Sequence, residues 1–234
     1  MKGKTTLLKK IMLLVFCAAC LWGTASQAQA KHTSVGVAAS STYVKENDSR
    51  QVILYVGDSR SMYMTCGGNK NNPKRRNFAF AYVNGGNVTC IDKNGSLTPY
   101  VEELIEKYRK RDPVIVFNFG LNGNGKVRKN AKRIIRIYRK WMKDYPDLRF
   151  VVESVNPTIL SKGSYSDKKV VKLNRLLQKE FEPDGIWMDN YTYIIENRII
   201  RQNGYGMRDN YHYKWKTCKK LLVRIRSWVE ENIV

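Results

Sequence analysis

The sequence predicts a three-layer α/β/α protein, in which helices cover both faces of a five-stranded parallel sheet. Two observations predict this class. The segments with strand character are continuously apolar, which indicates strands buried on both faces. Amphipathic segments of helical period separate these strands, an order typical of parallel sheets joined by helical crossovers. In such a sheet, ligands bind beyond the carboxyl ends of the strands.

Five segments have the character of strands. They are rich in apolar β-branched and aromatic residues, and the first four are followed directly by glycine or asparagine. In chain order they are Val52–Val56, Phe78–Val83, Val114–Phe119, Arg149–Val155 and Gly185–Met188.

Helices are predicted between and after these strands, because apolar residues recur there at the spacing of one helix face. Their expected ranges are residues 98–110, 126–144, 167–181 and 211–231. A further helix is expected to follow the Gly57-Asp58-Ser59 turn at the end of the first strand.

The first 30 residues have the pattern of a secretory signal peptide. Basic residues precede an apolar stretch from Ile11 to Trp22, and Ala28-Gln29-Ala30 is a small-x-small cleavage site. The apolar stretch is short for a membrane span, which needs about 20 residues. An uncleaved anchor and lipidation at Cys20 are the alternatives.

We therefore expect a signal peptide at residues 1–30, a polar linker at 31–50 and one folded domain at 51–234. No transmembrane span is expected in the mature chain, which is predicted to be secreted or associated with the cell wall. Removing residues 1–30, which hold four basic and no acidic residues, lowers the formal charge from +22 to +18. Such a charge favours anionic partners. Outside a cell these are wall polymers or an anionic membrane surface, and nucleic acid is not expected.

Three cysteines remain after the signal peptide. Cys66 and Cys90 flank the segment that follows the first helix, so they could form a bridge or stay as thiols. The third, Cys218, lies in the last predicted helix. No spacing of cysteine and histidine indicates a zinc site, and neither metal nor cofactor is expected.

The most informative motif is Gly57-Asp58-Ser59, which directly follows the first strand. A serine at this position presents its hydroxyl at the edge of the sheet where ligands bind. The structural alternative is that Asp58 or Ser59 only caps the helix that follows.

His212 is the only histidine of the predicted domain, since His32 lies in the linker. A nucleophilic serine needs a base that titrates near neutral pH, which is the usual role of histidine. Asp209 stands three residues before it, where a tight turn or a first helical turn would bring the two side chains together. The carboxylate could then hold the imidazole in the required tautomer. Asp209 could instead cap the last helix.

Taken together, these motifs resemble those of the SGNH (GDSL-type) hydrolases, whose fold is flavodoxin-like. The resemblance rests on Gly57-Asp58-Ser59, glycine after the second strand, Gly120-x-Asn122 after the third, and Asp209-x-x-His212. It implies that Ser59 is the nucleophile, His212 the base and Asp209 the residue that orients it. It also implies an oxyanion hole formed by the Ser59 N–H, the Gly86 N–H and the Asn122 side-chain amide, with Gly85 as the alternative glycine. The family usually has aspartate at the position of Gly123.

The resemblance implies a serine esterase. The predicted export, the basic charge and the aromatic residues favour a small acyl group, such as acetyl, on an extracellular or cell-wall polysaccharide as its substrate. Two alternatives stay open: a lipase, lysophospholipase or thioesterase of the same fold, and a non-catalytic basic module that binds the wall.

A set of aromatic residues lies around the fifth strand and the histidine loop: Trp187, Tyr191, Tyr193, Tyr205, Tyr211, Tyr213 and Trp215. Some are expected in the core, and those near His212 could instead stack on sugar rings. Residues 126–143 hold nine basic residues and no acidic one. They form either a solvated face or a surface that adheres to anionic glycans.

Overall fold

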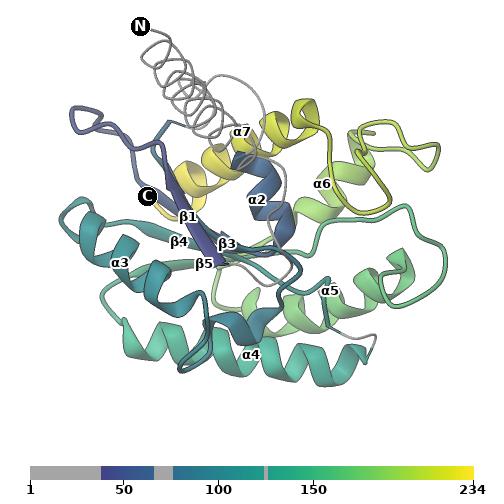
Figure 1. The fold of residues 1–234 in the computed structure, drawn as a ribbon, viewed down its shortest axis with the longest axis horizontal. Helices are drawn as coiled ribbons and strands as arrows, with labels where there is room; N and C mark the ends of the chain where they lie inside the picture. Colours follow the sequence, from purple (N-terminus) through teal and green to yellow (C-terminus); the bar gives the residue numbers. More distant parts are fainter. Residues whose placement is uncertain (1–37, 66–75, 124–125) are drawn as a thin grey trace, which may run out of the picture. The chain divides into compact units, whose positions relative to one another are not determined.

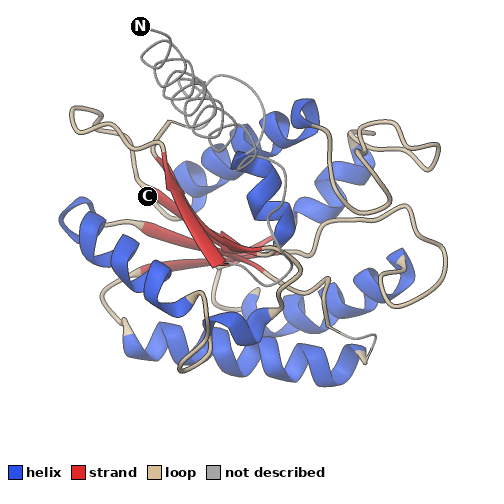
Figure 2. Ribbon diagram, in the orientation of Figure 1, coloured by secondary structure: helices blue, strands red, loops and turns tan. Residues whose placement is uncertain are grey.

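A six-stranded sheet with helices on both sides forms the centre of the fold (Figures 1 and 2). The structure, a computed structural model, describes residues 38–65, 76–123 and 126–234. The described residues all fall within one compact unit, residues 35–234. The strands are β1 (Ala38–Thr42), β2 (Ile53–Gly57), β3 (Phe78–Val83), β4 (Val114–Asn118), β5 (Arg149–Glu153) and β6 (Trp187–Met188).

The strand order is β1-β3-β2-β4-β5-β6, and every neighbouring pair is parallel except β1 with β3. From β2 the chain first adds β3 on one side and then β4 on the other. The topological switch point, where such sheets bind ligands, therefore lies at the carboxyl end of β2.

The sheet separates two apolar clusters, because successive strand side chains point to opposite faces. Leu54 and Val56 pack with residues of α3, α4 and α5, whereas Ile53 and Tyr55 pack with residues of α2, α6 and α7. Figure 1 shows these two groups of helices on opposite sides of the sheet. The helices are α2 (Ser59–Thr65), α3 (Thr98–Tyr108), α4 (Val127–Asp144), α5 (Asp167–Phe181), α6 (Asn190–Glu196) and α7 (Trp215–Asn232), with short 3₁₀ turns at Val88–Ile91 and Arg109–Arg111.

The predicted α/β class and its five parallel strands are confirmed, but the sheet has a sixth strand that we did not predict. β1 lies antiparallel along the edge of β3, within the segment that we expected to be a linker. The linker prediction is therefore wrong from residue 38 onward. The sequence of β1, AASST, lacks apolar alternation because an edge strand is only partly buried. What holds it is the backbone ladder, to which any residue type contributes.

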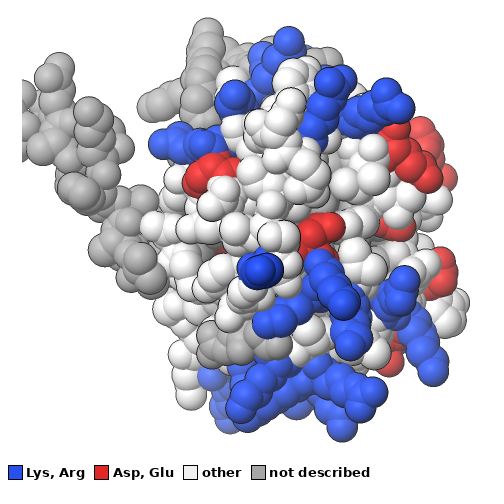
Figure 3. Space-filling view, turned by 90° about the vertical axis from the view of Figure 1, so that its right-hand side faces the viewer, with Lys and Arg blue, Asp and Glu red and all other residues white. Residues whose placement is uncertain are grey.

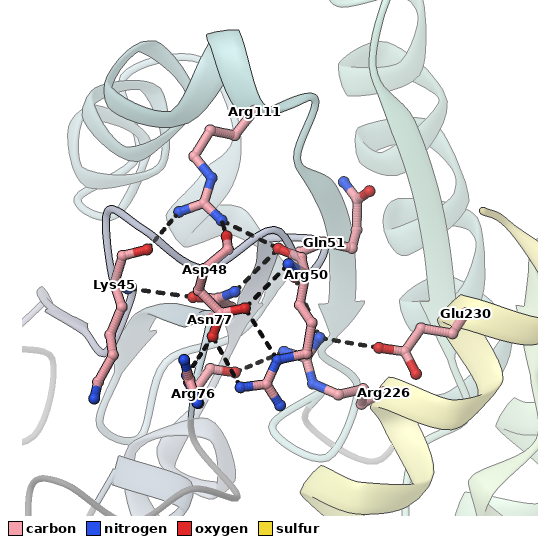
Figure 4. A network of polar contacts seen from close by, with 9 residues as sticks. All are labelled: Lys45, Asp48, Arg50, Gln51, Arg76, Asn77, Arg111, Arg226 and Glu230. Atoms are coloured by element: carbon pink, nitrogen blue, oxygen red, sulfur yellow. Dashed lines mark hydrogen bonds and ion pairs between the residues drawn. The ribbon is translucent and has the colours of Figure 1, made fainter.

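The rest of the expected linker is anchored by a polar network at the amino ends of the strands (Figure 4). The Asp48 carboxylate is buried, with 7% of the residue exposed, and it accepts hydrogen bonds from Arg50 and pairs with Arg76. Arg111, just before β4, donates to the Lys45 carbonyl at 2.9 Å. The hydrogen bonds from Arg50 keep the Asp48 pKa below its ordinary value, against the effect of burial. This network ties residues 45–50 to the sheet.

Two helices differ from the prediction. α6 was not predicted because its seven residues are too few to show a helical period. α7 begins at Trp215 rather than at residue 211, and its N-cap is Lys214. The residues before it form a loop closed by a bridge between Met207 and Tyr213. Asp209 therefore does not cap the last helix.

The structure bears only in part on the cysteine bridge, the signal peptide and the membrane spans. Cys90 is half buried, and its suggested partner Cys66 lies outside the described residues, as do Cys20 and the predicted signal peptide. Over the described ranges, none of the helices combines the length and the apolarity needed to cross a membrane.

Candidate active site

The site lies where β2 ends, at the junction with α2. Gly57 pairs with Tyr82 of β3 and with Asn118 of β4, so the loops that follow these strands open at the same edge as Ser59. Glycine is required at position 57 because the chain is crowded there. A Cβ atom on this residue would lie 2.6 Å from the Asn118 carbonyl oxygen and 2.1 Å from the Ser61 Oγ. The close approach of β4 therefore excludes any side chain directly before the Asp58-Ser59 turn.

The structure joins Ser59, His212 and Asp209 in one chain of hydrogen bonds. Ser59 Oγ lies 2.9 Å from His212 Nε2, and His212 Nδ1 lies 2.8 Å from Asp209 Oδ2. With the imidazole proton on Nδ1, the ring donates to the carboxylate, and Nε2 is left to accept the serine proton. Ser59 and His212 are 5% and 9% exposed, so little water competes for these bonds.

Asp209 also organises the loop that carries the histidine. Its Oδ1 atom accepts hydrogen bonds from the backbone N–H groups of Tyr211, at 3.0 Å, and His212, at 2.8 Å. Its other oxygen is the one that binds the imidazole. A tight turn thus brings residues 209 and 212 together, one of the two arrangements that their spacing predicts. The carboxylate both shapes the turn and orients the ring.

Burial and hydrogen bonding set the charges of this pair. Burial lowers the pKa of His212, and the hydrogen bond to Asp209 offsets only part of this effect. For Asp209, burial raises the pKa, but hydrogen bonds from Tyr211 and His212 outweigh it and leave the pKa below its ordinary value. A neutral imidazole beside an ionised carboxylate is the state that a general base requires.

Arg60, next to Ser59, was not among the residues predicted to form the site. Its guanidinium is buried, with 2% of the residue exposed. Nε donates to the Tyr211 carbonyl at 3.0 Å, Nη1 to the Asn156 carbonyl at 2.5 Å and Nη2 to the Pro157 carbonyl at 3.4 Å. One side chain therefore connects α2 to the histidine loop and to the loop after β5. The sequence carried no signal of this role, because arginine directly after a helix start is usually solvated.

Asn122 and Gly86, the other two predicted oxyanion donors, lie together. The Asn122 side-chain amide donates to the Gly86 carbonyl at 2.8 Å. This bond uses one of the two amide hydrogens. The Gly86 N–H points back to the Val83 carbonyl at 3.5 Å, which closes the turn at residues 83–86. Gly85 holds the positive φ of this turn, 70°, and Asn122 binds Gly86 rather than Gly85.

Aromatic side chains surround His212. The ring centroids of Tyr63 and Tyr211 lie 4.4 and 4.5 Å from that of the imidazole, and Tyr165 lies 5.9 Å from Tyr211. Tyr63 and Tyr165 were not predicted to belong to the site. Tyr63 could have been found, because it lies four residues after Ser59 and so shares its helix face. By contrast, Trp187 and Tyr213 of the predicted aromatic set are buried core residues.

No protein-family model and no curated protein matches the sequence. Solved structures do match the fold. An acetyl xylan esterase aligns with 76% of this chain and 98% of its own, at a TM-score of 0.52 and 14% identity. A lipase/acylhydrolase from Enterococcus faecalis aligns with 77% of this chain and 96% of its own, at a TM-score of 0.52 and 12% identity. An acetylxylan esterase from Geobacillus stearothermophilus was solved as a catalytic mutant. It aligns with 76% of this chain and 94% of its own, at a TM-score of 0.55 and 11% identity.

This chain has the SGNH-hydrolase fold. The fold predicted from the four motifs is thus confirmed, although fewer than one residue in six is shared with each of these structures. In the part of the chain that the structure describes, no group of three or more His, Cys, Asp and Glu could hold a metal ion.

Proposed function

We propose that the chain is a serine esterase of the SGNH type. One observation carries the proposal: the hydrogen-bonded series Ser59–His212–Asp209 at the switch point of the sheet. A serine hydroxyl is a weak nucleophile unless an adjacent base takes its proton. A buried, neutral histidine held by a carboxylate supplies that base.

In the proposed reaction, Ser59 Oγ attacks the ester carbonyl while its proton passes to His212 Nε2. Asp209 stabilises the imidazolium that forms. Collapse of the tetrahedral intermediate breaks the bond to the alcohol, which leaves with the proton from His212, and the acyl group stays on Ser59. Water then attacks this acyl-enzyme, gives a proton to His212, and releases the carboxylic acid and the free serine.

The negative charge of the tetrahedral intermediate would be met by the Ser59 N–H, the Gly86 N–H and the second N–H of the Asn122 amide. Each well-placed donor is worth about 3–4 kcal/mol of the barrier. The Asn122–Gly86 hydrogen bond supports this assignment, because it places two of the three donors on adjoining loops. For the Gly86 N–H to serve, its 3.5 Å bond to Val83 must open when substrate binds.

As substrate we propose a polysaccharide that carries small acyl groups such as acetyl, located outside the cell. The predicted signal peptide and the basic charge support this location. Tyr63, Tyr165 and Tyr211 provide ring faces beside His212 against which a sugar could pack. Two structural neighbours are acetyl xylan esterases by name, which supports an acetylated polysaccharide as substrate.

The esterase proposal is tested with p-nitrophenyl acetate. We expect the wild type to hydrolyse it and Ser59→Ala to lose at least about a thousandfold in kcat, as when a nucleophile of this type is removed. Equal activity in both proteins would refute the proposal and favour the non-catalytic wall-binding module.

A lipase or other acylhydrolase remains the second candidate, since one structural neighbour is named a lipase/acylhydrolase. A series of p-nitrophenyl esters from acetate to palmitate separates the two. Activity that falls with chain length supports the deacetylase, and activity that rises supports the lipase.

A further inference from the structure

The charges of α4 are balanced at one end of the helix and unbalanced at the other. Arg136 pairs with Asp92, Arg139 with Glu180 and Asp184, and Lys140 with Asp144. These pairs all belong to the second half of the helix. The first half and the N-cap residue before it carry five cations that have no carboxylate partner within the described residues: Lys126, Arg128, Lys129, Lys132 and Arg133. We call these five residues the α4 cationic cluster.

This arrangement is unfavourable for the isolated helix. The amino end of a helix carries a partial positive charge, so cations there are repelled. The first turn of α4 contains no acidic residue, and its N-cap, Lys126, makes no side-chain cap. Arg128 and Lys132 are four residues apart, as are Lys129 and Arg133, and such like-charged pairs each cost a few tenths of a kcal/mol. Nothing within the described fold offsets this repulsion between the cations and the helix amino end. Such an uncompensated arrangement is expected where a surface has a function.

The cluster adjoins the proposed active site. Gly123, directly after Asn122, lines a hollow of about 170 Å³ together with Lys126, Lys129, Asn130 and Arg133. Asn130 lies within the cluster and donates to the Gly120 carbonyl at 3.0 Å, which fixes α4 to the loop that carries Asn122. An anion in this hollow would therefore lie next to the loop that is proposed to hold the oxyanion.

Basic side chains of a second helix continue this surface. α5 packs beside α4, and Lys168, Lys172 and Arg175 of α5 are exposed. Lys169 lines a smaller hollow that shares Gly123 and Asn130 with the first. Figure 3 shows the right-hand side of the view in Figure 1, and Lys and Arg side chains gather along the lower part of this face.

From these observations we infer that the α4 cationic cluster binds the anionic groups of the substrate, so that the substrate is an acylated polysaccharide bearing carboxylates or phosphates. This inference rests on the proposed esterase function. Nucleic acid lacks the carboxylic ester that such a site cleaves. A membrane would call for apolar side chains to insert, and the large apolar side chains that are exposed in the described ranges lie outside α4.

The test compares an anionic with a neutral acetylated polymer, acetylated polygalacturonate and acetylated xylan. The variant Lys129→Gln/Arg133→Gln removes two charges from the hollow. The control Lys216→Gln/Lys220→Gln removes the same charge at the same spacing from α7, on the other side of the sheet. Neither pair belongs to the proposed catalytic residues.

We expect the cluster variant to raise KM for acetylated polygalacturonate about three- to tenfold, since exposed ionic contacts contribute up to about 1 kcal/mol each. Its kcat and its rates on acetylated xylan and p-nitrophenyl acetate should match the wild type. The control variant should change KM by less than about twofold, because α7 packs on the face of the sheet opposite to α4 and its charges do not line the hollow. Added NaCl should raise the wild-type KM for the anionic polymer, and the cluster variant should show a weaker dependence.

Three results would overturn the inference: an unchanged KM in the cluster variant, an equal rise in both variants, or tighter binding of DNA or of phosphatidylglycerol vesicles than of polygalacturonate. Binding of unmodified polygalacturonate to Ser59→Ala, measured by calorimetry, tests the α4 cationic cluster without requiring esterase activity. The esterase proposal and the anion-binding proposal can therefore fail separately. If the protein hydrolyses no ester yet binds the polymer through Lys129 and Arg133, the esterase fails and the anion-binding surface stands. If it hydrolyses p-nitrophenyl acetate but the variants bind alike, the surface fails alone.

Discussion

At the scale of single residues, the charge state of His212 decides when the site can work. Burial lowers the pKa of this histidine and Asp209 restores only part of it, so the ring stays neutral further into the acid range than a free histidine. The base is active above the pKa and lost as pH falls through it. We therefore expect the acid limb of the kcat/KM profile to have its midpoint below the ordinary value of 6.5.

The same profile in Asp209→Asn tests the partner. Without the carboxylate, the largest influence that raises the histidine pKa is lost, so any remaining activity should show its midpoint at still lower pH. The kcat should fall by about a hundredfold or more, because the wrong tautomer is no longer excluded. A wild-type midpoint above 6.5, or an unchanged kcat in the variant, would contradict the assignment.

Arg60 should matter almost as much, although it is not proposed to touch the substrate. Its guanidinium holds the carbonyls of Tyr211, Asn156 and Pro157, and lysine cannot reach all three with a single ammonium group. We expect Arg60→Lys to lower kcat about ten- to a hundredfold, since displacement of a catalytic group by about 1 Å has that effect. KM should change little.

The matched control is Arg201→Lys, an exposed arginine that lies over the Tyr205 ring. It should keep wild-type kcat. Thermal unfolding of Arg60→Lys shows whether a loss of kcat comes from a displaced histidine loop in a folded protein or from unfolding of the variant. A variant that unfolds below the assay temperature would be replaced by Arg60→Gln assayed in the cold. Full kcat in a folded Arg60 variant would refute the positioning role.

At the scale of elements, the network around Asp48 decides whether residues 45–50 hold to the sheet. The Asp48 pKa is depressed in the folded protein, so its contribution to stability is present above the ordinary pKa of 3.8 and is lost as pH falls below it. We expect Asp48→Asn to reduce the free energy of unfolding by about 2 kcal/mol at pH 7, because the half-buried Arg50 and Arg76 lose their buried, charged acceptor. The difference from wild type should shrink between about pH 5 and pH 2.

Denaturant unfolding at several pH values measures this difference. The control Glu46→Gln removes an exposed carboxylate two residues away and should leave stability unchanged. A constant difference between wild type and Asp48→Asn at every pH would show that the carboxylate charge is not what stabilises the network.

The elements that the sequence failed to predict share a physical cause. β1 and α6 are five and seven residues long, and neither carries enough apolar residues to show a period. The five parallel strands and the three long helices α3, α4 and α5 were predictable because each buries a continuous or periodic apolar surface. The start of α7 was placed four residues early, because the tight turn at Asp209 satisfies the backbone that a helix would otherwise use.

At the scale of the whole molecule, the remaining prediction concerns export. Residues 1–30 lie outside the described residues, and their leader pattern stays a prediction. We expect a cell that secretes the protein to release a chain that begins at Lys31. Amino-terminal sequencing of the secreted protein checks this. A secreted or membrane-bound chain that retains Met1 would favour the uncleaved anchor, and a lipid-modified Cys20 would favour lipidation.

The sequence by itself determined the class of the fold, the order of the parallel strands and helices, and the identities of Ser59, His212 and Asp209 as candidates. The fold class and these candidate residues follow from patterns within short segments, which can be read from the sequence alone. Only the tertiary structure decided that Ser59 and His212 lie within 2.9 Å, that Arg60 is buried between three loops, and that half of α4 lacks acidic partners. Each of these features depends on which segments, distant in the sequence, the fold brings together. Local periodicity does not determine such long-range contacts.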